Sequence, residues 1–296
     1  MTSETVVETR DFSYNYGAHG EFAAVRHLTM SVRRGELYAL LGTNGAGKTT
    51  TLETIEGHRR ATSGTVAVFG ADPTDRAKVR PRVGIMLQES GFAADLTVRE
   101  ELRLAGAISG RTDDASRVLE AIDLSAKADT RVGQLLGGEK RRLDFGMAIW
   151  GEPELLFLDE PTTGLDPSAR DGLWDVVTSL RENGVTIILT THYLEEAQKH
   201  ADRIGLMHRG ELVREGSIAE LVAGELSHIR FVSPAGLVPP LAVTSTENGV
   251  SIVDTDDLQR DLHSLLAWAD RENVRLDQLA ATSSNLDDVF RTLALS

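Results

Sequence analysis

The chain has 296 residues, a formal net charge of −14 and no cysteine. Its length allows one large domain or two smaller ones, each with its own core. The acidic balance argues against non-specific binding to nucleic acid or to an anionic membrane, and the lack of cysteine excludes disulfides and thiolate chemistry. We expect no membrane span, because no apolar run approaches roughly 18 residues, and no secretory signal, because residues 1–10 lack an apolar h-region.

Strands and turns are predicted at the start of the chain. Apolar and polar residues alternate over 4–12 and 25–33, as they do in half-buried strands. Between these stretches, Tyr-Asn-Tyr-Gly at 14–17 predicts a turn. Arg-Gly-Glu at 34–36 predicts a second turn, and the apolar run at 37–41 predicts the next strand.

A glycine-rich loop follows that strand. The sequence Gly-Thr-Asn-Gly-Ala-Gly-Lys-Thr-Thr at 42–50 has the P-loop spacing G-x4-G-K-[ST] and leads into a helical stretch. Its backbone N–H groups and the start of the helix would bind phosphate oxygens. Lys48 would reach the β- and γ-phosphates of a nucleotide, and the Thr49 hydroxyl would hold Mg²⁺. The expected phosphate-binding residues are Thr43, Asn44, Gly45, Ala46, Gly47, Lys48, Thr49 and Thr50.

Further strands are predicted over 64–70, 83–88, 155–158 and 185–190. Because these segments alternate with helical ones, we expect a mainly parallel sheet covered by helices. The second of these strands ends in Gln88.

Between these strands the sequence becomes helical. Residues 96–104 predict a helix that starts with Thr97 as cap and Glu100 three residues later, and 117–124 predict another. We interpret about 91–145 as a helical insert.

The pattern changes again after about residue 225. The predicted elements are strands over 228–232 and 250–253, a loop over 234–240, and helices over 256–272 and 284–295. We therefore expect two domains, 1–225 and 226–296, the second being a small α/β domain.

The strand over 155–158 ends in two carboxylates, Asp159 and Glu160, before Pro-Thr-Thr-Gly-Leu-Asp-Pro at 161–167. In a P-loop enzyme the aspartate holds Mg²⁺, and the glutamate would lie near the γ-phosphate as a base or water-positioner. Acidic strand ends are common in any sheet, but the stretch at 161–167 that follows favours the catalytic interpretation.

With these motifs in order, the chain resembles the nucleotide-binding subunit of an ATP-binding cassette (ABC) transporter. More narrowly, it resembles the ATPases of multidrug and antibiotic exporters of the daunorubicin-resistance type, including the tail Asn-Leu-Asp-Asp-Val-Phe at 285–290. The resemblance implies an α/β fold: a P-loop NTPase core (ABC ATPase) with a helical insert subdomain and a small C-terminal α/β domain. It also implies ATP and Mg²⁺ as cofactors.

The resemblance implies further site residues. Tyr16 would stack on adenine, although Tyr14 competes for that role. Gln88 would touch Mg²⁺ and the attacking water, Asp166 would lie at a dimer contact, and His192 would contact the γ-phosphate. The implied catalytic residues are Glu160, His192 and Gln88, and the implied metal ligands are Thr49, Gln88 and Asp159.

The chain departs from the family's signature, Leu-Ser-Gly-Gly-Gln, because it has Leu135, Leu136, Gly137, Gly138 and Glu139. The two glycines open a helix and can still offer N–H groups to phosphate. Leu136 lacks the serine hydroxyl, and losing one hydrogen bond to a charged group costs about 1.5–3 kcal/mol. We hypothesise that Leu136 makes self-paired sites close poorly or turn over slowly. The alternatives are pairing with a second, intact ATPase chain, or a leucine that is simply tolerated.

The resemblance also implies partners. A site built from the P-loop of one chain and the signature of another needs a homodimer or a second ABC ATPase chain. A separate membrane-spanning permease would supply the channel, placing the protein in the cytoplasm at the inner face of the cell membrane, with no nucleic-acid partner. We expect ATP hydrolysis that powers export of a drug or other hydrophobic compound.

Two other functions stay open. One is a nucleotide-dependent dimerisation or regulatory module with weak or vestigial hydrolysis. The other is a soluble ABC protein of translation or DNA repair, which the single cassette and short insert disfavour. The C-terminal domain is expected to support the dimer, and the cargo cannot be inferred from the residues.

Two groups of residues receive no site role. We expect Trp150, Trp174 and Trp268 to be core residues. Solvated or structural charges are expected at Arg80, Arg82, Arg141 and Arg142.

Overall fold

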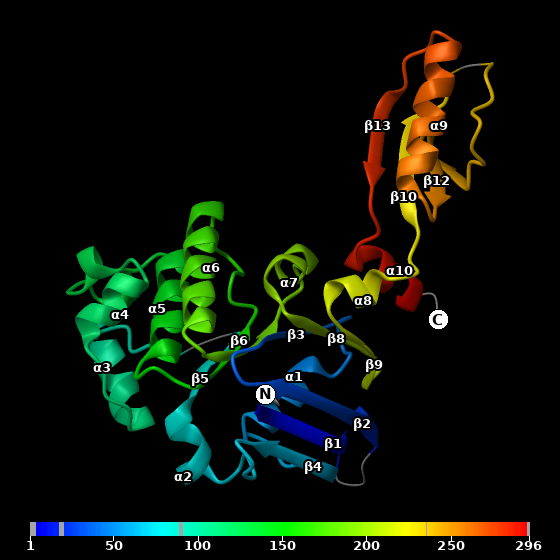
Figure 1. The fold of residues 1–296 in the computed structure, drawn as a ribbon. Coiled ribbons are helices and arrows are strands. Elements are labelled where there is room, and N and C mark those ends of the chain that lie inside the picture. Colours follow the sequence, from blue (N-terminus) through cyan, green and yellow to red (C-terminus); the bar gives the residue numbers. More distant parts are fainter. Residues whose placement is uncertain (1–3, 18–20, 89–90, 235, 295–296) are drawn as a thin grey trace. The chain divides into compact units, whose positions relative to one another are not determined.

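The structure is a computed structural model that describes residues 4–17, 21–88, 91–234 and 236–294. The backbone divides into two compact units, Met1–Ser217 and Ile218–Ser296 (Figure 1). The sequence interpretation placed the division a few residues later, after residue 225. No helix in the described ranges combines the length and the apolar character needed to cross a bilayer.

A six-stranded sheet forms the centre of the first unit. Its strand order is β5-β6-β7-β3-β8-β9. The bounds are β3 (Leu37–Gly42), β5 (Val83–Met86), β6 (Leu155–Asp159), β7 (Thr186–Thr190), β8 (Arg203–His208) and β9 (Glu211–Gly216). Every neighbouring pair is parallel except β8 with β9. The mainly parallel sheet is thus confirmed, and β3, β6 and β7 are apolar because helices and a second sheet cover them.

The second sheet of this unit is antiparallel and three-stranded. It consists of β1 (Thr5–Tyr16), β2 (Phe22–Arg33) and β4 (Ser63–Val68) in the order β2-β1-β4. The turn predicted at 14–17 is wrong over its first three residues, because they extend β1 by pairing with β2. The aromatic rings at Tyr14 and Tyr16 suit a strand, and the pairing partner is remote from the local turn signal.

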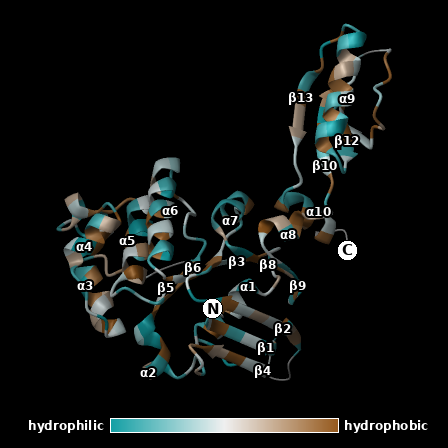
Figure 2. Ribbon diagram, viewed as in Figure 1, coloured by the Kyte–Doolittle hydropathy of each residue, from teal (hydrophilic) through white to brown (hydrophobic). Residues whose placement is uncertain are grey.

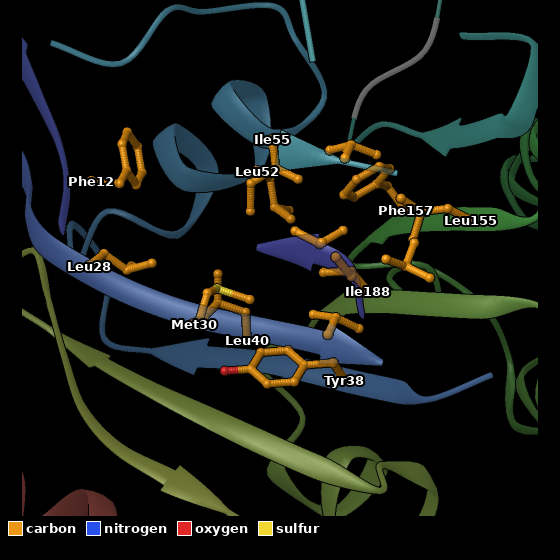
Figure 3. Close-up of a cluster of buried hydrophobic side chains, with 14 of the residues drawn as sticks. Phe12, Leu28, Met30, Tyr38, Leu40, Leu52, Ile55, Leu155, Phe157 and Ile188 are labelled. Atoms are coloured by element: carbon orange, nitrogen blue, oxygen red, sulfur yellow. The ribbon is translucent and has the colours of Figure 1, made fainter. Parts of the chain in front are cut away.

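The main core lies between these two sheets and helix α1 (Lys48–Ile55) (Figure 3). Phe12 comes from the antiparallel sheet, Leu52 from α1, and Tyr38 and Phe157 from the central sheet. All four are at most 2% exposed. Burial of this apolar surface, worth about 25 cal/mol per Å², fixes α1 against the strand that precedes it.

Helices α3 (Val98–Ser109), α4 (Ala115–Ala121) and α5 (Gly137–Ile149) lie together beside the central sheet (Figure 1). The cap predicted for α3 is confirmed. The Thr97 hydroxyl accepts a hydrogen bond from the Glu100 N–H at 3.3 Å, and the Glu100 carboxylate accepts one from the Thr97 N–H at 2.8 Å. Two short 3₁₀ turns, η2 (Ser125–Lys127) and η3 (Val132–Gln134), connect α4 to α5.

The sequence predicted no bounds for the remaining helical segments of the first unit. They are α2 (Arg76–Val79), the 3₁₀ turn η1 (Arg80–Arg82), α6 (Pro167–Glu182) and α7 (Leu194–His200). Trp150 and Trp174 are each 4% exposed, so their predicted place in the core is confirmed.

The second unit is a four-stranded antiparallel sheet with one long helix against it. Its strand order is β11-β12-β10-β13. The elements are α8 (Ile218–Val222), β10 (Ser227–Val232), β11 (Ser245–Glu247), β12 (Val250–Thr255), α9 (Leu258–Arg271), β13 (Asp277–Thr282) and α10 (Leu286–Ala294). Trp268 on α9 packs with Phe231 and Leu265 in a small core, as predicted. Figure 2 shows hydrophilic and hydrophobic residues alternating along α9, which fits burial of one helix face.

Candidate functional site

The site lies at the carboxyl ends of parallel strands in the central sheet. The loop 42–50 follows β3, Glu160 follows β6, and His192 follows β7. Strand β7 pairs with both β3 and β6 in parallel. Because carboxyl ends of parallel strands meet at one edge, the sheet brings together segments more than a hundred residues apart.

The glycine loop is shaped by its own packing. Gly47 caps α1 with φ 98°, and a Cβ there would lie 2.3 Å from the Ala24 carbonyl oxygen. A side chain is therefore excluded both by backbone conformation and by space. The Lys48 ammonium donates to the carbonyls of Gly42 and Thr43 at 2.6 and 3.2 Å. Phosphate oxygens would replace these neutral acceptors with charged ones.

The electrostatics of the loop and the strand end are linked. Burial lowers the pKa of Lys48, and the nearby charges of Glu160 and Asp159 oppose this shift. Burial likewise raises the pKa of Asp159, whose carboxylate accepts a hydrogen bond from the Thr190 hydroxyl. The Lys48 ammonium and the Asp159 carboxylate are thus both partly desolvated and close enough for their charges to interact.

Three side chains from three segments converge on the Glu160 carboxylate. The Gln88 amide donates at 3.4 Å, the Thr163 hydroxyl donates at 3.4 Å, and His192 Nδ1 lies 3.3 Å away. The Glu160 backbone has φ 48°, a left-handed conformation that is uncommon outside glycine. Such backbone conformations persist where the surroundings hold them. The structure therefore brings together the three residues expected to be catalytic.

The aromatic residues expected near the nucleotide lie beside the loop. The Tyr16 hydroxyl is 3.1 Å from the Thr50 hydroxyl, and the Arg59 guanidinium lies over the Tyr16 ring at 5.0 Å. Tyr14 packs against the main core and accepts a hydrogen bond from Arg59. Tyr16 thus contacts the loop directly through its hydroxyl, whereas Tyr14 packs against the core.

The stretch 136–139 forms the N-cap and the first residues of α5, and within the described part of the chain it makes no hydrogen bond or ion pair to the loop 42–50. Leu136 is the N-cap and is 73% exposed. Its N–H donates to the Glu139 carboxylate at 2.9 Å, which lowers the pKa of Glu139. A Cβ on Gly137 would have no neighbour within 4 Å, and one on Gly138 would make only ordinary contact. The fold of this chain therefore does not itself require glycine there.

Asp166 caps α6, because its carboxylate accepts a hydrogen bond from the Ala169 N–H at 3.0 Å. This contact gives Asp166 a structural role within the chain. The dimer contact expected for it stays a prediction.

Arg141 was expected to have no site role, and the structure corrects that expectation. Its guanidinium donates to the carbonyls of Gln88 and Glu160, among others, and its side chain is only 11% exposed. One sequence signal was present: Arg141 lies four residues after Gly137, and residues four apart on a helix share a face. Arg142 bonds instead to Asp123 and stays a structural charge.

The donor set fits a magnesium ion together with nucleotide phosphates. Thr49, Gln88 and Asp159 offer a hydroxyl, an amide and a carboxylate, and Thr49 is exposed. Mg²⁺ prefers oxygen ligands and is usually held by one or two carboxylates, water and phosphate oxygens. The described residues contain no group of three or more acidic or histidine side chains placed to hold a metal alone. The donors present therefore suit an ion that arrives with its nucleotide.

Comparison with known protein families gives three matches, of which two lie in the first unit and one in the second. A family model described as "ABC transporter" matches residues 25–163. A second, "ABC transporter domain-containing protein-like, C-terminal domain", matches residues 227–284. A third, "AAA domain, putative AbiEii toxin, Type IV TA system", matches residues 137–196.

Curated relatives match over nearly the whole chain. "Nod factor export ATP-binding protein I" of Burkholderia orbicola is 36% identical, covering 96% of each chain. "Linearmycin resistance ATP-binding protein LnrL" of Bacillus subtilis is 33% identical, covering 93% of this chain and 95% of its own. "Probable multidrug ABC transporter ATP-binding protein YbhF" of Escherichia coli is 38% identical over 74% of this chain and 38% of its own.

Solved structures match about three quarters of the chain. A structure described as "ATP binding subunit of ABC transporter" aligns with a TM-score of 0.68 at 28% identity, covering 74% of this chain and 92% of that one. CbiO1 of Clostridium perfringens, part of the ABC transporter complex cbiONQ, aligns with a TM-score of 0.66 at 25% identity, covering 75% and 92%.

Proposed function

This chain belongs to the ATP-binding subunits of ABC transporters, and from that premise we propose that it hydrolyses MgATP, with Glu160 as the base or water-positioner. The observation that carries the proposal is the convergence of Gln88 and His192 on the Glu160 carboxylate. Glu160 directly follows Asp159, and both charges act on Lys48. The proposed base Glu160, the metal ligand Asp159 and the phosphate-binding Lys48 thus lie together at the carboxyl ends of parallel strands.

Each residue of the site has a task in this reaction. The N–H groups of 42–50 and Lys48 would bind the β- and γ-phosphates. Thr49, Gln88 and Asp159 would hold Mg²⁺, which would supply positive charge beside the transferred phosphoryl group. Glu160 orients the attacking water and accepts its proton. His192, which follows the neighbouring strand β7, would contact the γ-phosphate and hold the Glu160 carboxylate in place.

The test is steady-state hydrolysis of MgATP by the purified chain and by Glu160→Gln. We expect the variant to bind MgATP but to lose about 10²- to 10⁴-fold in kcat, as for removal of a general base. Glu120→Gln is the matched control, because Glu120 is an exposed carboxylate on α4, away from the site. Turnover by Glu160→Gln at the wild-type rate would contradict the assignment.

We also propose that each site is completed by a second ATPase chain. Gly137 and Gly138 have room for a side chain within this chain, and Leu136 beside them is exposed. Close approach of another molecule to the backbone would explain why glycine stands at both positions. At the start of α5 their N–H groups are available to phosphate. The partner would be a second copy or another ABC ATPase chain.

The permease is proposed to dock in a groove between strand β5 of the central sheet and helix α3. The groove has a volume of about 400 Å³. Its apolar lining includes Val79, Val83, Ile85, Leu87, Ile108 and Phe157. The Ile108 side chain is 79% exposed and Leu87 is 43% exposed, which suits contact with a partner.

Charged side chains of both signs line this groove, namely Glu56, Arg80, Arg111 and Asp144, and Arg111 indicates the chemistry of the docking segment. Burial lowers the pKa of Arg111, while the charge of Asp113 opposes this shift, and the Arg111 Nε and Nη1 are buried with no hydrogen-bond partner among the described residues. A buried cation without an acceptor is costly. An apolar permease segment that carries a carboxylate or free backbone carbonyls would supply the missing acceptor.

For the cargo, we propose export of a drug or other hydrophobic compound through the separate permease, at the inner face of the cell membrane. Support comes from relatives named for Nod factor export, linearmycin resistance and multidrug transport. The permease, rather than this chain, would bind the cargo and determine which compounds are exported. Copurification of the membrane protein that binds this chain, followed by transport assays, tests both points.

A second function is a dimerisation or regulatory module whose hydrolysis is weak. The observation that favours it is Leu136, which has no hydroxyl for the phosphate and is exposed at the start of α5. MgATP-dependent dimerisation without turnover, with the permease present, would support this module and contradict the ATPase.

A further inference from the structure

Arg141 is the most extensively hydrogen-bonded buried cation of the described site. It lies in the second turn of α5, and its side chain is 11% exposed. Its Nη1 donates to the carbonyls of Leu87 and Gln88 at 2.9 and 3.2 Å. Its Nη2 donates to the carbonyls of Asp159 and Glu160 at 2.7 and 2.6 Å. One guanidinium therefore connects three segments that are remote in sequence.

Two more contacts complete its surroundings. Nε donates to the Pro161 carbonyl at 3.2 Å, and Nη1 lies 3.2 Å from the Asp144 carboxylate. Burial lowers the pKa of Arg141, while Asp144, Asp159 and Glu160 oppose that shift. The planar fork of a guanidinium has five N–H donors in fixed directions, which a lysine ammonium cannot reproduce.

The carbonyls that accept from Arg141 belong to the backbone that positions the Glu160 carboxylate. Glu160 holds a left-handed φ of 48°, and its N–H donates to the Thr190 carbonyl at 3.0 Å. Arg141 holds the carbonyls on both sides of this strained position. Arg141 also donates to the backbone carbonyl of Gln88, and the Gln88 side chain in turn donates to the Glu160 carboxylate.

We propose that Arg141 is a positioning residue that ties the backbone at Gln88 and the backbone at Glu160 to helix α5, so that displacement of any one of these segments moves the Glu160 carboxylate. The inference rests on the proposed ATP hydrolysis for its kinetic consequence, but the mechanical link can be measured without turnover. Arg141 itself touches neither nucleotide nor water in this role.

The neighbouring arginine provides a matched control. Arg142 lies on the same helix and is also partly buried, with its side chain 22% exposed. It donates to the Asp123 carbonyl at 3.0 Å and to the Asp123 carboxylate at 2.7 Å, at the end of α4. Its loss removes a cation and a helix contact but leaves the backbone at Gln88 and Glu160 held.

The experiment compares wild type with Arg141→Gln, Arg141→Lys and Arg142→Gln in MgATP hydrolysis, nucleotide binding and amide hydrogen exchange. We expect Arg141→Gln to lower kcat about 100-fold, as a misplacement of about 1 Å does. KM should stay close to the wild-type value, because nucleotide binding is retained. Arg141→Lys should recover part of kcat, since an ammonium can serve some of the acceptors. Arg142→Gln should keep the wild-type kcat.

Amide exchange separates this inference from the proposed activity. We expect faster exchange at 86–88 and 159–163 in Arg141→Gln and not in Arg142→Gln, both with thermal midpoints near that of wild type. A wild type that hydrolyses no ATP would overturn the proposed activity, whereas this exchange difference would still support the link. If Arg141→Gln does not fold, Arg141→Lys serves in both measurements. Unchanged kcat and unchanged exchange in the folded variant would overturn the inference.

Discussion

The imidazole Nδ1 of His192 lies 3.3 Å from the Glu160 carboxylate, so the ends of β7 and β6 are joined through side chains. The His192 side chain is half exposed, and its ring also packs against Tyr193 at 4.0 Å. The contact places an imidazole next to the proposed base at the carboxyl ends of two interior strands.

From this contact we predict that His192→Ala lowers kcat for MgATP by about 10²-fold or more, as for loss of a positioned proton-transfer or phosphate contact. Because Lys48 and the loop remain, nucleotide affinity should change little. Steady-state hydrolysis and equilibrium nucleotide binding check the two parts. The control is His263→Ala, in the second unit, which should leave both quantities unchanged. Equal loss in the two variants would contradict the prediction.

Leu136→Ser is predicted to raise the rate of hydrolysis. The hydroxyl would restore one hydrogen bond to a charged group, worth about 1.5–3 kcal/mol, or about 10- to 150-fold if felt fully in the transition state. The measurement is steady-state ATPase with the permease present. Leu266→Ser, an equally simple change at an exposed leucine of α9, is the control. Equal, fast rates for wild type and Leu136→Ser would show that leucine is tolerated.

Gly137→Ala is predicted to weaken MgATP-dependent dimerisation while the monomer stays stable. The methyl group has open space within the chain, but overpacking a tight interface costs about 1–3 kcal/mol. Gly172→Ala on α6 is the matched control, because its added Cβ also has open space. Sedimentation of both variants in a Glu160→Gln background, with MgATP, measures the dimer. Equal dimerisation of the two would argue against a contact at Gly137.

Glu154→Gln is predicted to alter how stability depends on pH. The Arg82 and Arg34 guanidinium groups lower the Glu154 pKa from 4.5 to about 2. Because the folded pKa is depressed, the ionised carboxylate stabilises the fold above pH 4.5, and this contribution is lost as pH falls toward 2. Glu154 is 41% exposed, so solvent screening limits the effect to about 1 kcal/mol or less.

Denaturant unfolding at several pH values checks this prediction. The difference in unfolding free energy between wild type and Glu154→Gln should be largest near neutral pH and shrink as pH falls below 4.5. Glu152→Gln is the control, since Glu152 is 76% exposed and lies 3.9 Å from its arginine. A difference that grows on acidification would refute the assignment.

Much of the site was predictable because its signals are local. The glycine loop, the Asp159–Glu160 strand end and the Thr97 cap each depend on a few consecutive residues whose backbone conformation and hydrogen bonds are short-range. Gln88 and His192 could be placed only through the family resemblance. Their meeting at the Glu160 carboxylate was not predicted, because it depends on the order of the strands in the sheet.

The sequence by itself determined the phosphate loop, the helix after it and the parallel strands β3, β5, β6 and β7, because apolar periodicity and turn signals act within a few residues. Tertiary structure alone decided that β1, β2 and β4 form a separate sheet, that Tyr14 and Tyr16 extend a strand, and that Arg141 joins Gln88 to Glu160. These features depend on contacts between remote residues. Such contacts form only where the packing of the whole unit compensates for the chain entropy of bringing the segments together.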